Sequence, residues 1–124
     1  HQAGDRVLQQ TAGILRNTAR EIDRIGRYGG EEFMAILPQT GIEDGEVFVE
    51  RVRREVARHP FDIGPGGPIC MTVSAGVASY PFPGIDDPEM LIRRADQALY
   101  AAKQAGRNRV VRHDHLAATE PDRS

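Results

Sequence analysis

Apolar residues recur at three- and four-residue steps in three stretches of the chain, which is the spacing of a helix with one buried stripe. The first stretch covers residues 5–20, with Asp5 as the expected N-cap. The second covers residues 43–59 and is expected to end at the proline that follows. The third begins with an acidic cap and a proline at residues 86–89 and is expected to end at Gly106. The pattern therefore predicts three amphipathic helices.

After the first helix the pattern changes to two short runs of β-type residues. Residues 22–28 and 32–37 flank the glycines Gly29 and Gly30. A two-residue glycine loop indicates a hairpin with a type I′ turn, because both central positions of that turn need positive φ.

Two further strands are expected in the second half of the chain. Residues 69–79 carry apolar side chains at alternate positions, which predicts a long central strand, and residues 107–113 predict a final one. The order of elements predicts an α/β (α+β) fold, with a mixed, mainly antiparallel central sheet covered by helices. A helix followed by a hairpin is ordinarily fed by a preceding strand, so the sheet is expected to lack its first strand.

Composition narrows the class of protein. The 124 residues include 16 basic and 18 acidic side chains, which gives a formal charge of −2. The absence of a basic excess argues against general binding to nucleic-acid polymers. With 40% hydrophobic and 27% charged residues, a single soluble globular domain is expected. No apolar run approaches the roughly 20 residues of a membrane span. The single cysteine, Cys70, excludes an intrachain disulfide, favours a cytoplasmic setting and is expected to be a small buried hydrophobe.

The predicted hairpin turn is the most informative place for chemistry, because Glu31 and Glu32 follow directly after two residues without side chains. Such a bare turn lets a ligand approach the backbone. Glu31 is the better candidate ligand for Mg²⁺, which usually combines one or two carboxylates with substrate phosphates. The alternative is a common hairpin with two solvated glutamates. His113 and His115, near the C-terminus, are expected to face solvent rather than to bind metal.

Five separated segments carry recognisable motifs: HQAGD at 1–5, RYGGEEF at 27–33, TVSAGV at 72–77, ADQALYAAK at 95–103 and GRN at 106–108. In this order they resemble the blocks of GGDEF domains, the diguanylate cyclases, in the GGEEF variant of the signature. The resemblance implies a nucleotidyl-cyclase, palm-like fold. It also implies condensation of two GTP molecules, one on each subunit of a homodimer, into cyclic di-GMP and two pyrophosphates, with Mg²⁺ or Mn²⁺.

The resemblance assigns roles to residues around the signature. Glu31 would be a metal ligand and the base for the attacking hydroxyl, and Glu32 would be a second catalytic residue. Gly29 and Gly30 would leave room for the nucleotide. Asp5 would accept hydrogen bonds from the guanine edge, which suits an ionised carboxylate because it only accepts.

Two cations near the end of the third predicted helix complete the expected substrate site. In the family, the residues at Lys103 and Arg107 reach the triphosphate. For Arg107 the alternative is ordinary complementation of the helix dipole. Lys103 is the only lysine among the 16 basic residues, so a compact ammonium at this position is less easily explained by composition.

A second expected site binds the product. Arg20 and Asp23 resemble the Arg-x-x-Asp inhibitory site of these enzymes, at the family's spacing from the signature, and Arg51 corresponds to a further arginine of that site. There, arginine binds guanine edges and phosphates of cyclic di-GMP, and aspartate accepts guanine N–H groups. The alternatives are a solvated pair of Arg20 with Asp23 and an ion pair of Arg51 with Glu55.

The expected domain covers residues 1–113, followed by a C-terminal tail at 114–124. The resemblance implies that a metal-holding aspartate and a guanine-reading asparagine belong to a strand before His1. The parent protein is therefore expected to be an active cyclase, while this chain alone is expected to be inactive and still able to bind cyclic di-GMP. The sequence leaves membrane attachment of the parent protein open. The alternative function is a non-catalytic receptor for cyclic di-GMP.

Overall fold

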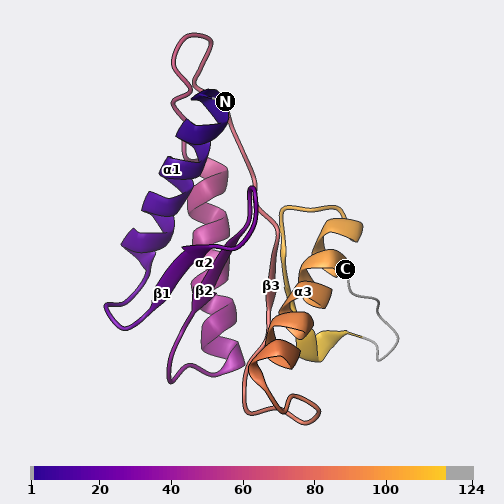
Figure 1. Cartoon of the computed structure of the whole chain (residues 1–124). Helices are drawn as coiled ribbons and strands as arrows, with labels where there is room; N and C mark the ends of the chain where they lie inside the picture. The colour runs from indigo at the N-terminus through magenta and orange to yellow at the C-terminus, as the bar shows by residue number, and fades with distance from the viewer. Residues whose placement is uncertain (1, 117–124) are drawn as a thin grey trace.

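The computed structural model describes residues 2–116, which form three long helices, four short strands and a short 3-10 helix (Figure 1). The mixed α/β fold predicted from the sequence is confirmed, although the strands form two separate two-stranded sheets rather than one central sheet. The elements are α1 Gln2–Thr18, β1 Arg24–Arg27, β2 Phe33–Ile36, α2 Ile42–Arg58, β3 Ala75–Val77, α3 Pro88–Gln104, β4 Val110–Arg112 and η1 His113–His115.

Helix α1 starts earlier than the sequence pattern predicted. Asp5 lies inside its first turn, so the prediction that Asp5 caps the helix is wrong. A carboxylate in the first turn still stabilises the helix, because the unpaired N–H groups at this end carry partial positive charge. The predicted buried stripe is present at Thr11, Ala12 and Leu15.

The hairpin forms, but its turn is longer than predicted. Strands β1 and β2 pair antiparallel from Arg24 opposite Ile36 to Arg27 opposite Phe33, which leaves residues 28–32 as the loop. The Tyr28 amide donates to the Glu32 carbonyl at 2.8 Å and closes this loop. Neither glycine has a φ in the left-handed region, so the prediction of a type I′ turn is wrong. Both glutamates of the signature therefore belong to the loop rather than to a strand.

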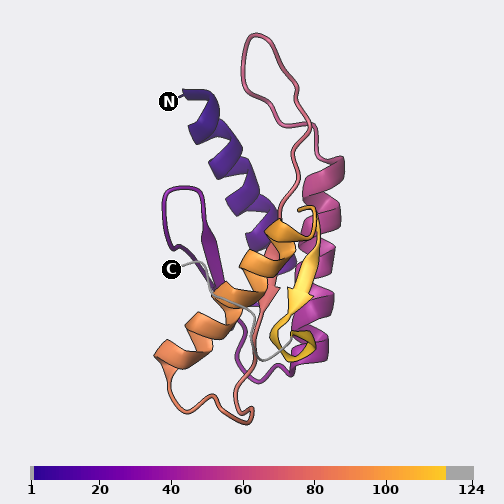
Figure 2. The ribbon, with the colours of Figure 1, turned by 90° about the vertical axis from the view of Figure 1, so that its right-hand side faces the viewer.

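The second sheet lies between two helices. Strands β3 and β4 pair in parallel, and both contact α2 and α3. Figure 2 shows α3 crossing in front of β3, with β4 beside the helix. The predicted strand at 69–79 is reduced to Ala75–Val77, because residues 69–74 find no continuous neighbouring strand and make only one isolated bridge, between Ile69 and Phe61. The alternation predicted burial only in part, since Val77 is buried but Met71 is 36% exposed, and it did not predict which strand would pair.

The hydrophobic core joins α1 to α2. It is built from Leu15, Val52, Val56 and Phe61, of which Val56 and Phe61 are completely buried. Burying each such side chain contributes about 1.5–3 kcal/mol. This contact fixes α1 beside α2 and thereby positions the hairpin that follows α1.

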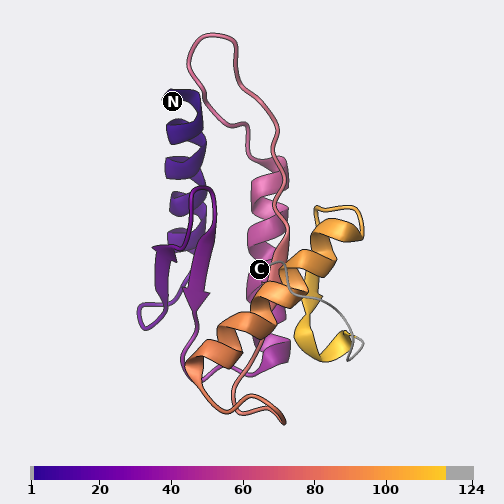
Figure 3. The ribbon, with the colours of Figure 1, turned by 45° about the vertical axis from the view of Figure 1, so that its right-hand side comes forward.

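A long loop between α2 and β3 reaches the N-terminal end of α1 (Figure 3). Gln10 holds it by donating to the Asp62 carbonyl at 2.7 Å and accepting from the Asp62 amide at 3.0 Å. Cys70 lies in the segment that returns from this loop and is exposed, so its expected burial is wrong. Because the strand predicted around Cys70 does not form, no second layer covers its side chain.

Both ends of α3 lie where the sequence predicts them. Asp87 caps the helix by accepting from the Met90 amide at 2.8 Å, and Gly106 follows the helix with a φ of 124°. The amide of Arg107 donates to the Ala102 carbonyl at 2.9 Å, completing a Schellman-type ending.

The first residues of the predicted tail are folded in this structure. Asp114 and His115 belong to η1, and Asp114 accepts from Arg112. His113 is partly buried with its ring edge-on to Phe82, so the expectation that it faces solvent is wrong, whereas His115 is exposed. Residues 117–124 of the predicted tail lie outside the described residues.

Candidate nucleotide site

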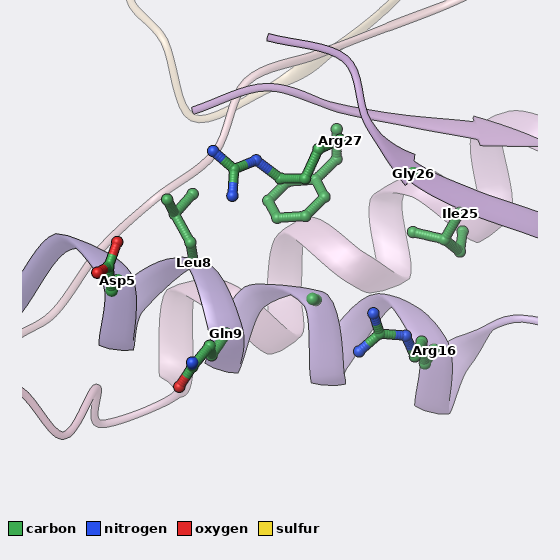
Figure 4. A pocket seen from close by; sticks show the side chains of 9 residues that line it. Asp5, Leu8, Gln9, Arg16, Ile25, Gly26 and Arg27 are labelled. Atoms are coloured by element: carbon green, nitrogen blue, oxygen red, sulfur yellow. The ribbon is translucent and has the colours of Figure 1, made fainter. Parts of the chain in front are cut away.

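A cleft of about 310 Å³ separates α1 from the hairpin. Figure 4 shows Asp5 and Leu8 projecting from α1 on one side and Arg27 extending from the end of β1 on the other. The structure therefore places Asp5, the predicted guanine contact, opposite the start of the signature. The lining residues are Asp5, Leu8, Gln9, Ala12, Arg16, Ile25, Gly26, Arg27 and Phe33.

Arg27 connects this cleft to the signature loop. Its guanidinium donates to the Gly30 carbonyl, and its Cζ lies 5.9 Å from the centre of the Phe33 ring. Arg27 therefore both lines the cleft and stabilises the signature loop through its hydrogen bond to Gly30. Sequence reasoning gave no role to Arg27 or Leu8, although Arg27 stands inside the quoted motif and Leu8 belongs to the predicted stripe of the first helix.

The glycines of the loop are not required by packing. A Cβ placed on Gly30 would meet no atom within 4 Å, and one on Gly29 would meet only Glu32, at 3.7 Å. Neither position has a left-handed φ, so backbone conformation does not require glycine either. The effect of the two glycines is instead to leave the outer surface of the loop open to an approaching ligand.

The two glutamates of the loop have different surroundings. Glu31 is exposed. The Oε2 atom of Glu32 lies 3.9 Å from Nζ of Lys103, and both side chains are about a quarter exposed, at 23% and 28% respectively. The structure thus brings the end of α3 to the signature loop, and places an ammonium beside the Glu32 carboxylate.

Arg107 follows α3 and is exposed, with a φ of 64°. Its amide closes the helix end, which leaves the guanidinium outside the Schellman turn. Neither Lys103 nor Arg107 lines the cleft beside Asp5. The predicted substrate residues therefore occupy two neighbouring places: the cleft, and the region between the loop and the end of α3.

The expected product site is built at the opposite end of the hairpin from the signature loop. Nη2 of Arg20 donates to Oδ1 of Asp23 at 2.8 Å, and the Arg20 amide donates to Oδ2 at 2.7 Å. The Asp23 side chain is 1% exposed, so it is not a solvated carboxylate. The hydrogen bond from Arg20 holds the pKa of the Asp23 carboxyl below its ordinary value, against the opposing effect of burial.

Asp23 in this structure holds Arg20 rather than facing solvent. Its carboxylate oxygens accept from the amide, Nε and Nη2 of Arg20. A direct contact of Asp23 with guanine would require Arg20 to move aside. Arg20 itself is half exposed, at 50%, so its guanidinium is the group already available to a ligand.

Arg51 lies on the exposed face of α2, beside a second cleft of about 580 Å³. The alternative for Arg51, an ion pair with Glu55, is not present, because Glu55 pairs with Arg58 instead. Within residues 2–116 no hydrogen bond or ion pair joins Arg51 to Arg20 or Asp23. A shared product site that includes Arg51 therefore stays a prediction.

The hairpin with its carboxylate-bearing loop, the adjoining cleft and the α/β layers define a domain of the GGDEF class. The sequence model of this family, described as "Diguanylate cyclase, GGDEF domain", matches residues 1–109. The chain belongs to the GGDEF domain family.

Curated relatives agree with this assignment. The chain is 47% identical over 110 residues to diguanylate cyclase DgcP of Pseudomonas aeruginosa, covering 89% of this chain and 16% of that protein. It is 43% identical over 112 residues to the response regulator PleD of Caulobacter vibrioides, covering 90% of this chain and 24% of that protein. The chain thus spans less than a quarter of the length of these relatives.

Solved structures give the same fold. The active GGEEF domain of a diguanylate cyclase from Vibrio cholerae superposes with a TM-score of 0.83 at 36% identity, covering 91% of this chain and 70% of that one. The GGDEF domain of DgcB from Caulobacter crescentus, in complex with c-di-GMP, gives a TM-score of 0.83 at 34% identity, covering 92% of this chain and 67% of that one.

Within residues 2–116 no helix is long and apolar enough to cross a membrane.

Proposed function

We propose that the protein containing this chain condenses two GTP molecules into cyclic di-GMP and two pyrophosphates, and that this chain binds both the substrate and the product. The observation that carries the proposal is the signature loop: neither packing nor backbone conformation requires its two glycines, and its Glu32 carboxylate lies 3.9 Å from the Lys103 ammonium. Membership of the GGDEF family and the c-di-GMP complex of the similar DgcB domain support it.

The family resemblance assigns the roles in this chemistry, and the positions of the loop and the cleft are compatible with them. Asp5 would accept hydrogen bonds from the guanine N–H groups in the cleft. Glu31 would take the proton of the attacking 3′-hydroxyl as its oxygen bonds to the α-phosphorus and the bond to the departing pyrophosphate breaks. Lys103 and Arg107 would bind triphosphate oxygens, and a homodimer would bring the two GTP molecules together.

Mg²⁺ or Mn²⁺ fits the donor set only together with the nucleotide. Glu31 offers an exposed carboxylate, and phosphates supply the remaining oxygens in many such sites. Within residues 2–116 no group of three His, Cys, Asp or Glu side chains forms a metal site by itself. When bound, the ion neutralises triphosphate charge.

Nucleotide binding to the 124-residue chain tests the substrate half of this proposal. We expect GTP with Mg²⁺ to bind more tightly than ATP, measured by titration calorimetry. Asp5→Asn should weaken GTP binding about tenfold and remove most of the preference over ATP, because a charged acceptor for guanine is lost. Equal affinity for GTP and ATP in the unchanged chain contradicts the role of the cleft.

We propose that this chain alone does not catalyse the condensation. The resemblance places one metal-holding aspartate and a guanine contact before His1, and loss of such groups commonly costs several powers of ten in rate. Incubation of the chain with GTP and Mg²⁺ at high protein concentration should give no cyclic di-GMP by chromatography. Ready product formation overturns this part of the proposal and leaves the binding half intact.

A further inference from the structure

We infer that Thr40 is a positioning residue of the product site, holding the guanidinium of Arg20 in place for the ligand. The inference rests on the proposed binding of cyclic di-GMP at Arg20. It comes from contacts between two turns that are far apart in sequence, since Arg20 precedes β1 and Thr40 follows β2.

The hydroxyl of Thr40 both donates and accepts a hydrogen bond in this contact. Its hydrogen is donated to the Pro38 carbonyl at 3.0 Å, and its oxygen accepts from Nη2 of Arg20 at 2.7 Å. Nη2 also donates to the Pro38 carbonyl at 2.9 Å. Because the hydroxyl hydrogen is committed to Pro38, the lone pairs of the oxygen remain directed at the guanidinium.

The donors of Arg20 divide into a held set and an open set. Nε and Nη2 are held by Asp23 and by the turn at 38–40. No protein atom in the part of the chain that the structure describes accepts from Nη1. The two N–H groups of Nη1 are therefore presented to solvent on a side chain that is already fixed.

Fixing this arginine matters because its side chain has many rotamers. An unrestrained arginine loses that freedom when it binds a phosphate or a guanine edge, which weakens the complex. Asp23 restrains Arg20 from its own turn only, three residues away, whereas Thr40 restrains it from the turn that follows β2. Thr40 thus ties the position of Arg20 to the foot of the hairpin.

Calorimetric titration of the chain with cyclic di-GMP tests the inference. Thr40→Val, which keeps the shape of the side chain but removes the hydroxyl, should weaken binding about tenfold. Thr40→Ser should restore affinity to within about twofold, because the hydroxyl returns. Thr18→Val is the matched control, since the Thr18 hydroxyl donates to the Ile14 carbonyl at 2.8 Å and, within residues 2–116, makes no hydrogen bond to Arg20.

Two comparisons separate a positioning role from a merely structural one. In the Arg20→Ala background, adding Thr40→Val should cause no further loss of affinity, because Thr40 acts through Arg20. A further loss equal to that in the unchanged chain overturns the inference, as does a Thr40→Val chain that binds as tightly as Thr40→Ser. Thr40→Ala replaces Thr40→Val if the latter lowers the unfolding midpoint.

The proposed product site fails on a different result. If Arg20→Ala binds cyclic di-GMP as tightly as the unchanged chain, the site does not lie at Arg20, and the role of Thr40 falls with it. If Arg20→Ala weakens binding and Thr40→Val does not, only the role of Thr40 is wrong.

Discussion

Gly76 is where strand β3 packs directly on the backbone of helix α3. A Cβ placed on Gly76 would lie 2.2 Å from the Ala95 carbonyl oxygen and 2.3 Å from the Leu99 nitrogen. Ordinary contacts between such atoms are about 3.5 Å, so Gly76→Ala leaves roughly 1 Å too little room. The obstructing atoms belong to a helix backbone, which cannot rotate away as a side chain would.

Overpacking of a core commonly costs about 1–3 kcal/mol, and the rigid obstacle puts Gly76→Ala at or above about 3 kcal/mol. That is a large share of the roughly 5–15 kcal/mol by which a small domain is stable, and corresponds to a fall of about 10 °C or more in the midpoint. Thermal unfolding followed by circular dichroism measures it.

Gly13→Ala is the control for this prediction. Gly13 lies inside α1 with no atom within 4 Å of an added Cβ, so alanine there should stabilise the chain by about 0.5–1 kcal/mol. A Gly76→Ala chain within about 0.5 kcal/mol of the unchanged one would refute the close packing of β3 on α3. Because α3 also carries Lys103, that result would remove the basis for placing Lys103 beside the signature loop.

Three other outcomes are expected. Lys103→Met should weaken GTP binding by about tenfold in calorimetry, with Lys103→Arg in between; unchanged affinity would show that the ammonium does not meet the triphosphate. Asp23 should contribute its full stabilisation above the pKa of its carboxyl in the unfolded chain, because Arg20 binds the ionised form. This contribution should be lost as the pH falls through the lowered pKa of Asp23 in the folded chain. Urea unfolding midpoints measured down to about pH 2.5 test this, and Asp23→Asn should reduce the dependence of the midpoint on pH in that range. Arg112→Met should lower the unfolding midpoint, because three carboxylates of α2 and η1 share a guanidinium that is only 12% exposed, whereas exposed Arg54→Met should change it little.

Local signals predicted the helices well. Asp87 followed by proline marked the start of α3, and Gly106 marked its end, because capping chemistry depends on a few neighbouring residues. Strands were less predictable. The alternation around Cys70 indicated a strand that does not form, since a strand needs a neighbour to pair with and the periodicity of one segment does not report that neighbour.

In the candidate site, too, local motifs could be predicted from the sequence but contacts between distant residues could not. The signature and the motif at Arg20 and Asp23 were visible in the sequence, but their arrangement was not. No local pattern indicates that Glu32 approaches Lys103 or that Arg20 reaches Thr40, because these contacts join residues that are distant in the chain. The burial of Asp23 was also hidden, since an Arg-x-x-Asp pair at a helix end is usually solvated.

We propose that the hairpin carries two guanine-nucleotide sites, one at each end. An amide NMR titration of the 124-residue chain, with GTP and Mg²⁺ in one series and cyclic di-GMP in another, tests it most directly. We predict that GTP shifts the amides of Asp5, residues 27–33 and Lys103, while cyclic di-GMP shifts those of residues 20–23 and of Gln39 and Thr40. Cyclic di-GMP shifts confined to the signature loop, or no shifts with either nucleotide, would contradict the account.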